Sequence, residues 1–367
     1  MTKKIRAIGA AVLVSIWAAL SAFAWFSPAK GTSEAERRPL AQFPELSADT
    51  LLSGKFMTEF EDYTLDQFPG RDAFRQLKSL VHYRVLNQKD NNGIYIVDGY
   101  AAKLDYPVNT DALAHAMGRL NYVYETYLKP NGSKVYAAVI PDKSYYLAEK
   151  NGYPAMDYDA LFETVKDSLP WATYIDLTDC LTAQDYYFTD THWRQEALLP
   201  AAEKLCQAMG VTGPKVEDFT KTQIERPFYG VYYGQAALPM EPEELYIMES
   251  QLLSDCRVYN YDTQKETNVY DMDQLISKDL YDVYLSGAQS LLRIDNPNAK
   301  TDRELIVFRD SFGSSMVPLL VQDYKTVTLV DIRYLSSQML GRYLEFNGQD
   351  VLMLYSTLVL NSGTTLK

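Results

Sequence analysis

The amino-acid sequence predicts a three-layer α/β domain with a parallel sheet, preceded by a hydrophobic N-terminal segment. The first observation is that short apolar runs alternate with helical patterns in the last third of the chain, at residues 304–308, 326–332 and 350–356. Strands that are joined by helices form right-handed crossovers and therefore a parallel sheet. The second observation is that hydrophobic residues make up 47% of the 367-residue chain, which allows a sizeable core.

Residues 1–27 form a candidate membrane segment. Residues 7–26 carry no charge and follow the basic stretch MTKKIR. About 20 helical residues span the ~30 Å hydrocarbon core of a bilayer. Basic residues before the span predict a single-pass protein of the cell membrane with its domain outside the cytoplasm. The alternative is a secreted protein with a cleaved signal peptide, because Ala22 and Ala24 form a small-x-small cleavage site.

The next elements are expected in the following order. Residues 28–50 are rich in proline and charge and are interpreted as a linker, so that the main domain covers residues 51–367. Residues 51–86 have helical spacing with a break at Pro69 and Gly70. Residues 93–104 predict a β-hairpin, because an Asp-Gly pair lies between two short apolar runs.

The middle of the chain begins the α/β pattern. Residues 134–141 and 173–177 are short β-rich runs, and residues 193–210 follow as a helix that Pro200 is expected to kink or split. Residues 211–300 are irregular and polar, and they are interpreted as an insertion or cap.

Charge and cysteine content exclude several classes of function. A net charge of −13 without a basic stripe argues against nucleic acid as a partner. The three cysteines, Cys180, Cys206 and Cys256, show neither metal-ligand spacing nor a disulfide framework, and buried thiols are expected. A single Asp-x-His supplies too few ligands for a metal site. No metal and no cofactor is therefore predicted.

One candidate chemical group lies in the stretch YYFTDTHWRQEA, residues 186–197. In an extended segment, residues two apart project to the same face, so the Asp190 carboxylate can accept a hydrogen bond from the His192 imidazole. The second ring nitrogen of His192 is then available as a base. The alternative is that Asp190 and Thr191 cap the following helix.

A second candidate lies in VFRDSFGSS, residues 307–315. Strand, tight turn and helix follow in order, which places Ser311 beyond the carboxyl end of a strand, where sites of such sheets gather. A serine needs a base to become a nucleophile, and histidine suits that role. The alternative is that Asp310 and Ser311 form only a strand-to-helix turn.

Six motifs occur in an order that resembles the DHHW family of exported Gram-positive proteins. They are ERRPLAQFP at 36–44, DQFPGRD at 66–72, VIPDK at 139–143, FTDTHW at 188–193, RDSFGSSMVPLL at 309–320 and VDIRYL at 330–335. That family is similar to the SGNH-hydrolase-like proteins that O-acetylate alginate and related exopolysaccharides. The resemblance covers nearly all of the chain after the membrane segment, and it implies an SGNH-hydrolase-like fold with a permuted motif order.

The resemblance also implies a set of site residues. The acetylating relatives use an Asp and a His of a D-x-H-W motif and a later Ser, which correspond here to Asp190, His192 and Ser311. Two features depart from the family pattern. Thr191 occupies the first of the two adjacent histidine positions that give the family its name, and no Gly-Asn pair supplies oxyanion donors, so that Gly287 is only a weak candidate.

Three further residues are supporting candidates. Lys143 ends the VIPDK motif, and Asp310 precedes the candidate nucleophile. Arg333 follows a strand that neighbours the Ser311 strand, and we expect it to hold Asp310 by a bidentate contact. The alternative for Arg333 is a surface pair with Asp331 that contributes little.

The sequence and the resemblance together predict a serine-type acyl, and specifically acetyl, transferase or esterase that acts on a cell-surface polysaccharide. The resemblance implies a membrane-bound O-acyltransferase as partner. The alternative hypothesis is a non-catalytic protein that binds glycan or scaffolds a cell-envelope complex.

A chain that begins at Pro28 is predicted to be soluble and folded, because the only long uncharged segment ends at Phe26. Sedimentation of membranes from cells that express this shortened chain measures its partition. Recovery of the shortened chain with the membranes, or as insoluble protein, would contradict the division into anchor and domain.

Overall fold

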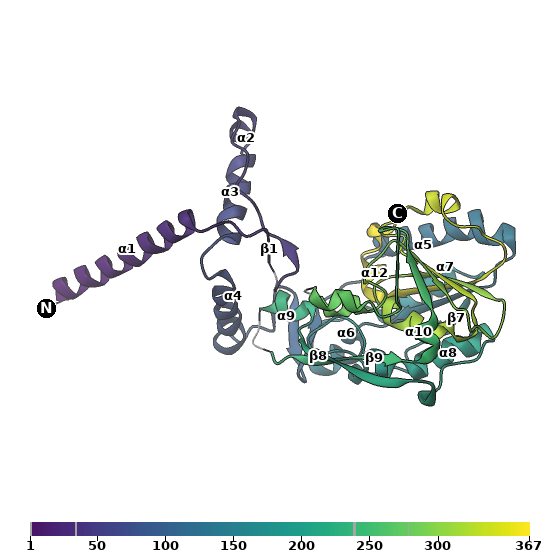
Figure 1. Cartoon of the computed structure of the whole chain (residues 1–367). Helices are drawn as coiled ribbons and strands as arrows, with labels where there is room; N and C mark the ends of the chain where they lie inside the picture. Colours follow the sequence, from purple (N-terminus) through teal and green to yellow (C-terminus); the bar gives the residue numbers. More distant parts are fainter. Residues whose placement is uncertain (1, 34, 238–239, 278) are drawn as a thin grey trace. The chain divides into compact units, whose positions relative to one another are not determined.

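The computed structural model describes residues 2–33, 35–237, 240–277 and 279–367 (Figure 1). The chain divides into two compact units. The first comprises Met1–Asn91 and Tyr233–Pro239, and the second comprises Asn92–Tyr232 and Met240–Lys367. Residues 51–91 therefore group with the N-terminal segment, whereas the sequence analysis assigned them to the main domain. Contacts such as the ion pair between Arg71 on α4 and Glu36 explain this grouping.

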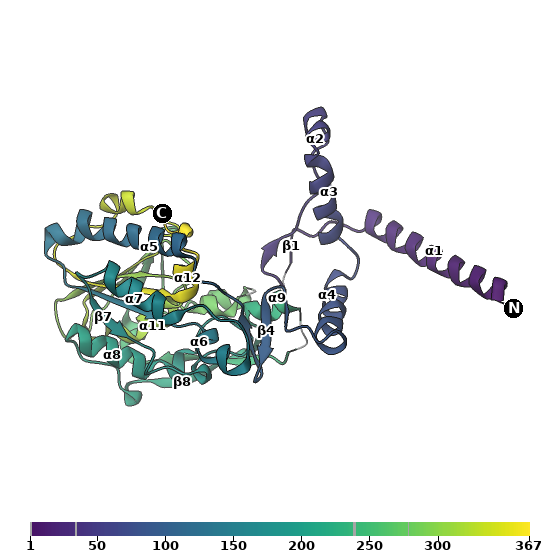
Figure 2. The same ribbon diagram turned by 180° about the vertical axis from the view of Figure 1, so that it is seen from behind.

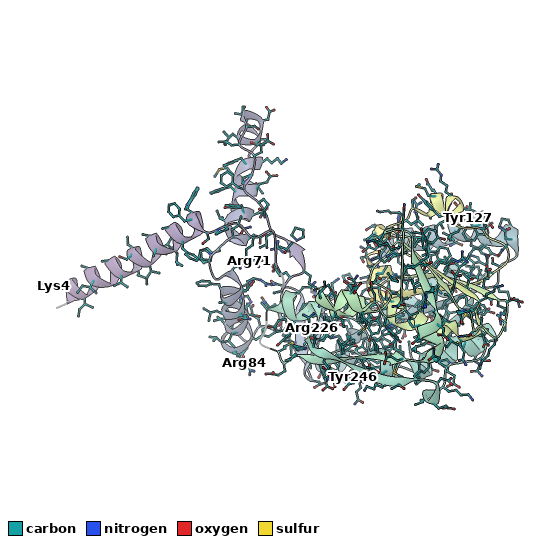
Figure 3. The ribbon with its side chains drawn as sticks, viewed as in Figure 1. Lys4, Arg71, Arg84, Tyr127, Arg226 and Tyr246 are labelled. Carbon is teal, nitrogen blue, oxygen red and sulfur yellow. The ribbon has the colours of Figure 1, made fainter. Side chains whose placement is uncertain are left out.

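The first unit begins with the long apolar helix α1 (Thr2–Phe26). Among the described residues, the segment Lys4–Phe26 is the one helix that is long and apolar enough to cross a membrane, judged by length and composition. Figure 3 labels Lys4 near its start, where the basic residues precede the apolar span. This helix fits either a membrane anchor or a signal peptide.

The rest of the first unit is a set of short elements. Strand β1 (Thr32–Ser33) pairs antiparallel with β2 (Arg38–Pro39), so the predicted linker contains paired backbone. The helical region is interrupted at Gly54 and Gly70. Each glycine has a positive φ angle and immediately precedes a new helix. The remaining elements are α2 (Ala48–Leu52), α3 (Lys55–Asp66), α4 (Arg71–Leu80), a π-helical turn at Val81–Val85 and β3 (Asp90–Asn91).

The second unit is built on an eight-stranded mixed sheet with the strand order β11-β10-β12-β14-β13-β15-β6-β7. The five strands from β14 to β7 are parallel. The other three strands, β12, β10 and β11, each pair antiparallel with their neighbours in the sheet. The bounds are β6 (Val135–Ile140), β7 (Thr173–Asp176), β10 (Arg257–Asn260), β11 (Lys265–Thr267), β12 (Leu291–Asp295), β13 (Glu304–Arg309), β14 (Thr326–Val330) and β15 (Asp350–Ser356).

Side chains on alternate positions of these strands fill two separate cores. On one face, Val307 and Leu352 pack with helix α8 (Leu199–Met209). On the other face, Ile306 and Met353 pack with α5 (Thr110–Val123) and α7 (Tyr158–Ser168). Figures 1 and 2 show α5 and α7 on one side of the sheet and α8 on the other. The predicted three-layer α/β class is confirmed.

The interpretation of residues 211–300 as an insertion or cap is wrong for its second half. Strands β10, β11 and β12 extend the central sheet, because β12 pairs antiparallel with β14. The first half forms a separate antiparallel pair, β8 (Thr220–Phe228) with β9 (Glu243–Glu249). The predicted parallel sheet is therefore present as the five strands from β14 to β7, within a larger mixed sheet.

Two of the helices that connect the strands are shorter than the sequence predicts. The helix expected at residues 193–210 is split, since a 3-10 turn at Gln195–Ala197 precedes α8 and Pro200 lies in the first turn of α8. After β13, α11 (Gly313–Met316) tightens into a 3-10 helix at Val317–Asp323. The remaining α-helices and β-strands are β4 (Ile94–Val97), β5 (Tyr100–Lys103), α6 (Lys143–Leu147), α9 (Val231–Ala236), α10 (Gln251–Asp255) and α12 (Thr357–Asn361).

The predicted hairpin at residues 93–104 is present as β4 and β5. Asp98 and Gly99 both have positive φ angles, 52° and 85°, as a two-residue type I′ connection requires. All three cysteines are free thiols. Cys206 and Cys256 are buried as expected, and burial raises the pKa of each to about 12.

Truncation of Ile306 to alanine is expected to destabilise the second unit by about 2–5 kcal/mol, because this side chain is only 3% exposed in the middle of β13. The matched control is Ile276→Ala, which removes the same atoms from a side chain that is 91% exposed and should change stability by less than about 0.5 kcal/mol. Denaturant unfolding measures both. Equal losses would contradict the described core.

Candidate active site

The first part of the candidate site is a tight loop after β7. Tyr186 and Trp193 form an isolated antiparallel bridge, and the Tyr187 amide donates to the carbonyl oxygen of His192 at 3.1 Å. The intervening residues are therefore folded back on themselves. Helix α8 begins only at Leu199, so the alternative in which Asp190 caps that helix does not hold.

The Asp190 carboxylate is fully buried and orients this loop. Its Oδ1 accepts from the backbone amide of His192 at 3.0 Å and from His192 Nδ1 at 2.6 Å. Its Oδ2 accepts from the backbone amide of Val231 at 2.7 Å. With Nδ1 donating to a carboxylate, the neutral imidazole presents Nε2 as an acceptor.

The second part of the site is the turn after β13. The Asp310 side chain accepts from the Phe312 amide at 3.0 Å, and the Gly313 amide donates to the Asp310 carbonyl oxygen at 3.1 Å. These bonds fold the chain sharply between strand β13 and helix α11. Ser311 lies at the tip of this turn and is partly exposed, whereas its neighbours Asp310 and Phe312 are buried.

The structure brings these two parts together. His192 Nε2 lies 2.8 Å from Ser311 Oγ. Asp190, His192 and Ser311 thus form a continuous hydrogen-bonded chain, although His192 and Ser311 are 119 residues apart in sequence. In such a chain the imidazole can take the serine proton while the carboxylate stabilises the resulting imidazolium.

Aromatic side chains fix the His192 ring. Tyr281 stacks on this ring, with the two ring centroids 3.9 Å apart and the ring planes 9° apart. The centroid of the Phe312 ring lies 4.8 Å from that of the imidazole. Trp193 donates through Nε1 to the Phe312 carbonyl oxygen at 3.1 Å and to Ser315 Oγ at 2.9 Å, which ties the two parts of the site to each other. The imidazole therefore has little freedom to turn away from Ser311.

The expected contact between Arg333 and Asp310 is absent. Arg333 donates to Asp331 instead, through Nε at 2.9 Å and Nη2 at 2.6 Å. Asp310 Oδ2 instead accepts hydrogen bonds from the amide and the hydroxyl of Ser356, at 2.8 and 2.7 Å. The pair of Arg333 with Asp331 is not on the surface, because Asp331 is fully buried.

Gly287, the weak candidate for an oxyanion donor, does not supply one. Its amide donates to the Tyr284 carbonyl oxygen at 3.0 Å, and its own carbonyl oxygen accepts from Ser314 Oγ at 3.3 Å. The glycine is needed for its backbone, since φ is +76° and a Cβ atom would lie 2.1 Å from Asp282 Oδ1. Gly287 therefore contacts the turn at residues 310–314, which we call the serine turn, through its carbonyl oxygen.

Lys143 lies close to the loop at residues 186–193, which we call the histidine loop. Its ammonium group is buried and donates to the Tyr187 carbonyl oxygen at 2.8 Å. Sequence reasoning missed Glu243, which accepts from the Thr189 amide at 2.6 Å, and it missed Tyr281. Glu243 lies in an acidic stretch, EPEE, that is typical of a solvated loop, so no local signal marked it.

No group of three or more His, Cys, Asp or Glu side chains is arranged to hold a metal ion in the part of the chain that the structure describes. The other two histidines lie outside the candidate site. His115 contacts the carbonyl oxygen of Leu366 at 2.9 Å, and His82 lies in the π-helical turn that follows α4.

Residues 174–330, which contain both parts of the site, match the family model described as DHHW protein. The chain resembles the DHHW family. A DHHW family protein from Eubacterium siraeum has a similar structure, with a TM-score of 0.61 and 22% identity over 75% of this chain and 94% of that chain. The comparison with curated proteins gives no match.

Bacillus cereus PatB1 also has a similar structure. Its TM-score is 0.57, with 19% identity over 73% of this chain and 96% of that chain. PatB1 with a sulfonyl adduct gives the same TM-score of 0.57, at 20% identity over 73% of this chain and 95% of that chain. At these identities the likeness establishes the fold.

Gly230 is expected to be intolerant of any side chain, because a Cβ atom would lie 2.3 Å from the backbone and Cβ of Asp190. Gly230→Ala should lower the stability of the second unit by about 1–3 kcal/mol, the cost of overpacking. Gly118→Ala in helix α5 is the control, since its Cβ meets nothing within 4 Å and alanine favours a helix. Denaturant unfolding measures both variants. A neutral Gly230→Ala would contradict the close approach.

Proposed function

We propose that this protein is an extracytoplasmic serine-type acyltransferase or esterase that acts on a cell-surface polysaccharide, with acetyl as the transferred group. The observation that carries the proposal is the hydrogen-bonded chain from Asp190 through His192 to Ser311. In this proposal Ser311 is the nucleophile, His192 is the general base and acid, and Asp190 orients the imidazole.

The reaction proceeds in two halves. Ser311 Oγ attacks the acyl carbonyl carbon while its proton passes to His192 Nε2. The tetrahedral intermediate then collapses, the leaving group takes that proton, and an acyl-serine ester remains. In the second half, an acceptor hydroxyl gives its proton to Nε2 and attacks the ester, and Ser311 regains the proton. A sugar hydroxyl as acceptor gives transfer, and water gives hydrolysis.

A donor for the developing oxyanion is needed near Ser311. The amides of Phe312, Gly313 and Ser314 already donate within the turn. The Ser311 amide, for which the described residues supply no partner, is our candidate donor.

The N-terminal helix and the family resemblance support the cellular setting that we propose. Helix α1 would anchor the protein in the cell membrane, and the basic residues at its start favour an extracytoplasmic second unit. The resemblance to polysaccharide-acetylating proteins supports a membrane-bound O-acyltransferase as the partner that delivers the acyl group. Cleavage after Ala24 would instead release a secreted protein.

Serine reactivity is the decisive test. Full-length protein in detergent is treated with phenylmethanesulfonyl fluoride, a reagent that suits the fold because PatB1 has been solved with a sulfonyl adduct. Intact-mass spectrometry should detect one sulfonyl group on the wild type and none on Ser311→Ala. Ser362→Ala is the matched control, because this exposed hydroxyl contacts only its own helix, and it should label normally. Equal labelling of wild type and Ser311→Ala would place the nucleophile elsewhere.

Turnover of 4-nitrophenyl acetate by the same variants tests the roles of the three residues. Ser311→Ala and His192→Ala should each lower kcat by about 10⁴-fold or more, because members of one catalytic unit are non-additive. Asp190→Asn should cost a comparable or somewhat smaller factor, because it disturbs the tautomer of His192. A wild type that shows neither turnover nor labelling would favour a glycan-binding or scaffolding protein.

A further inference from the structure

Two consecutive peptide groups just before Asp190, those that join residues 187–188 and 188–189, are held by side chains of opposite charge. The Lys143 ammonium, at the start of α6, donates to the carbonyl oxygens of Tyr187 at 2.8 Å and Phe188 at 3.4 Å. The Glu243 carboxylate, at the start of β9, accepts from the amides of Phe188 and Thr189. We call this arrangement of Lys143, Glu243 and residues 187–189 the loop clamp.

The clamp extends to residues 230 and 231, the segment whose Val231 amide donates to Asp190 Oδ2. Glu243 also accepts from Thr189 Oγ1 at 2.5 Å, and Thr189 Oγ1 accepts from the Gly230 amide at 2.9 Å. The next amide, that of Val231, donates to Asp190 itself. Glu243 therefore acts on both chain segments whose backbone amides hold the Asp190 carboxylate.

The energetic cost of the clamp argues that it serves more than stability. Lys143 is 2% exposed, and burial lowers the pKa of its ammonium to about 7. Burial also raises the pKa of Glu243 above its usual range. A buried charge is costly unless it is directly paired, and an apolar pair of similar volume often stabilises a protein as well.

The charged and titratable groups that face Lys143 come from several elements. Glu243 on β9, Asp190 on the histidine loop and Asp142 beside Lys143 itself each favour the charged ammonium. The rings of Tyr232 and Tyr100 lie 5.1 and 5.9 Å from Nζ, and their faces attract a cation. This environment is built around an ammonium ion that is close to losing its proton.

We propose that Lys143 and Glu243 are positioning residues, which hold residues 187–189 so that Asp190 stays aligned with His192. The inference rests on the proposed function, because alignment matters only if His192 takes the serine proton. A displacement of about 1 Å in such a unit can cost on the order of 100-fold in rate. In this role, Lys143 and Glu243 act on Ser311 only indirectly, through Asp190 and His192.

The experiment uses the full-length protein in detergent and two near-isosteric variants, Lys143→Met and Glu243→Gln. Each should lower kcat for 4-nitrophenyl acetate by about 10- to 100-fold with little change in KM. The matched controls are Lys129→Met and Glu266→Gln, which remove exposed charges of the second unit. The two variants are independent, so the failure of one to fold leaves the other as the test.

A proton NMR measurement reads the alignment without any turnover. The Nδ1 proton of His192, which is donated to Asp190, should give a resonance far downfield that is absent in His192→Ala. Both clamp variants should shift or broaden this resonance, and the control variants should leave it unchanged. Folded clamp variants with an unchanged resonance and unchanged kcat would overturn the proposal.

The pH profile separates positioning from a purely structural role. The ammonium is present below about pH 7 and is lost above it, so kcat of the wild type should fall as the pH rises through about 7. Lys143→Arg keeps its charge throughout and should remove this fall. An alkaline fall that persists unchanged in folded Lys143→Arg would contradict the role of the ammonium. A wild type with neither turnover nor sulfonyl labelling would contradict the proposed function instead, while the NMR result would still test the clamp.

Discussion

The buried carboxylate of Asp190 is the constraint on which the rest of the site depends. A fully buried carboxylate must have its acceptor capacity satisfied, and here it accepts from the amides of His192 and Val231 and from the His192 ring. These bonds fix three things together: the fold of the histidine loop, the approach of the segment at residues 230–231, and the ring nitrogen that faces Ser311. No side chain fits at Gly230 because this approach is so close.

The sheet supplies the rigidity that the loop needs. Buried carboxylates near the carboxyl ends of two parallel strands bind the strand between them. Asp310, after β13, accepts from Ser356 at the end of β15, and Asp142, after β6, accepts from Thr357 Oγ1 at 2.7 Å. Ser311 and Lys143 each follow one of these carboxylates directly in sequence. The serine turn and the clamp are therefore both attached, through these carboxylates, to the residues at the end of β15.

The histidine loop is held from three directions by unlike interactions. Aromatic stacking by Tyr281 fixes the ring plane, hydrogen bonds from Trp193 join the loop to the serine turn, and the clamp holds the backbone before Asp190. Stacking and hydrogen bonding to the neighbouring turn resist rotation of the imidazole. The clamp resists displacement of the backbone, which these two contacts do not control. This division agrees with the proposed acyl transfer, in which the ring must keep its position while the proton moves in both directions.

The sequence by itself determined those features that depend on near neighbours. Short apolar runs between helical patterns located β13, β14 and β15, and the Asp-Gly pair located the β4–β5 hairpin. The two-residue spacing of Asp190 and His192 allowed their contact. The charge-free segment after MTKKIR indicated α1. In each case the deciding interaction joins residues within a few positions of one another, so its pattern is visible along the chain.

Only the tertiary structure decided which polar groups pair with each other and which strands form the antiparallel end of the sheet. Arg333 pairs with Asp331 because Ser356, from another strand, already occupies Asp310. Strands β10 to β12 join the central sheet because β12 pairs antiparallel with β14. Glu243 reaches the histidine loop across 54 residues of sequence. Hydrogen bonding and burial depend on which segments meet, and the packing of the whole chain determines that.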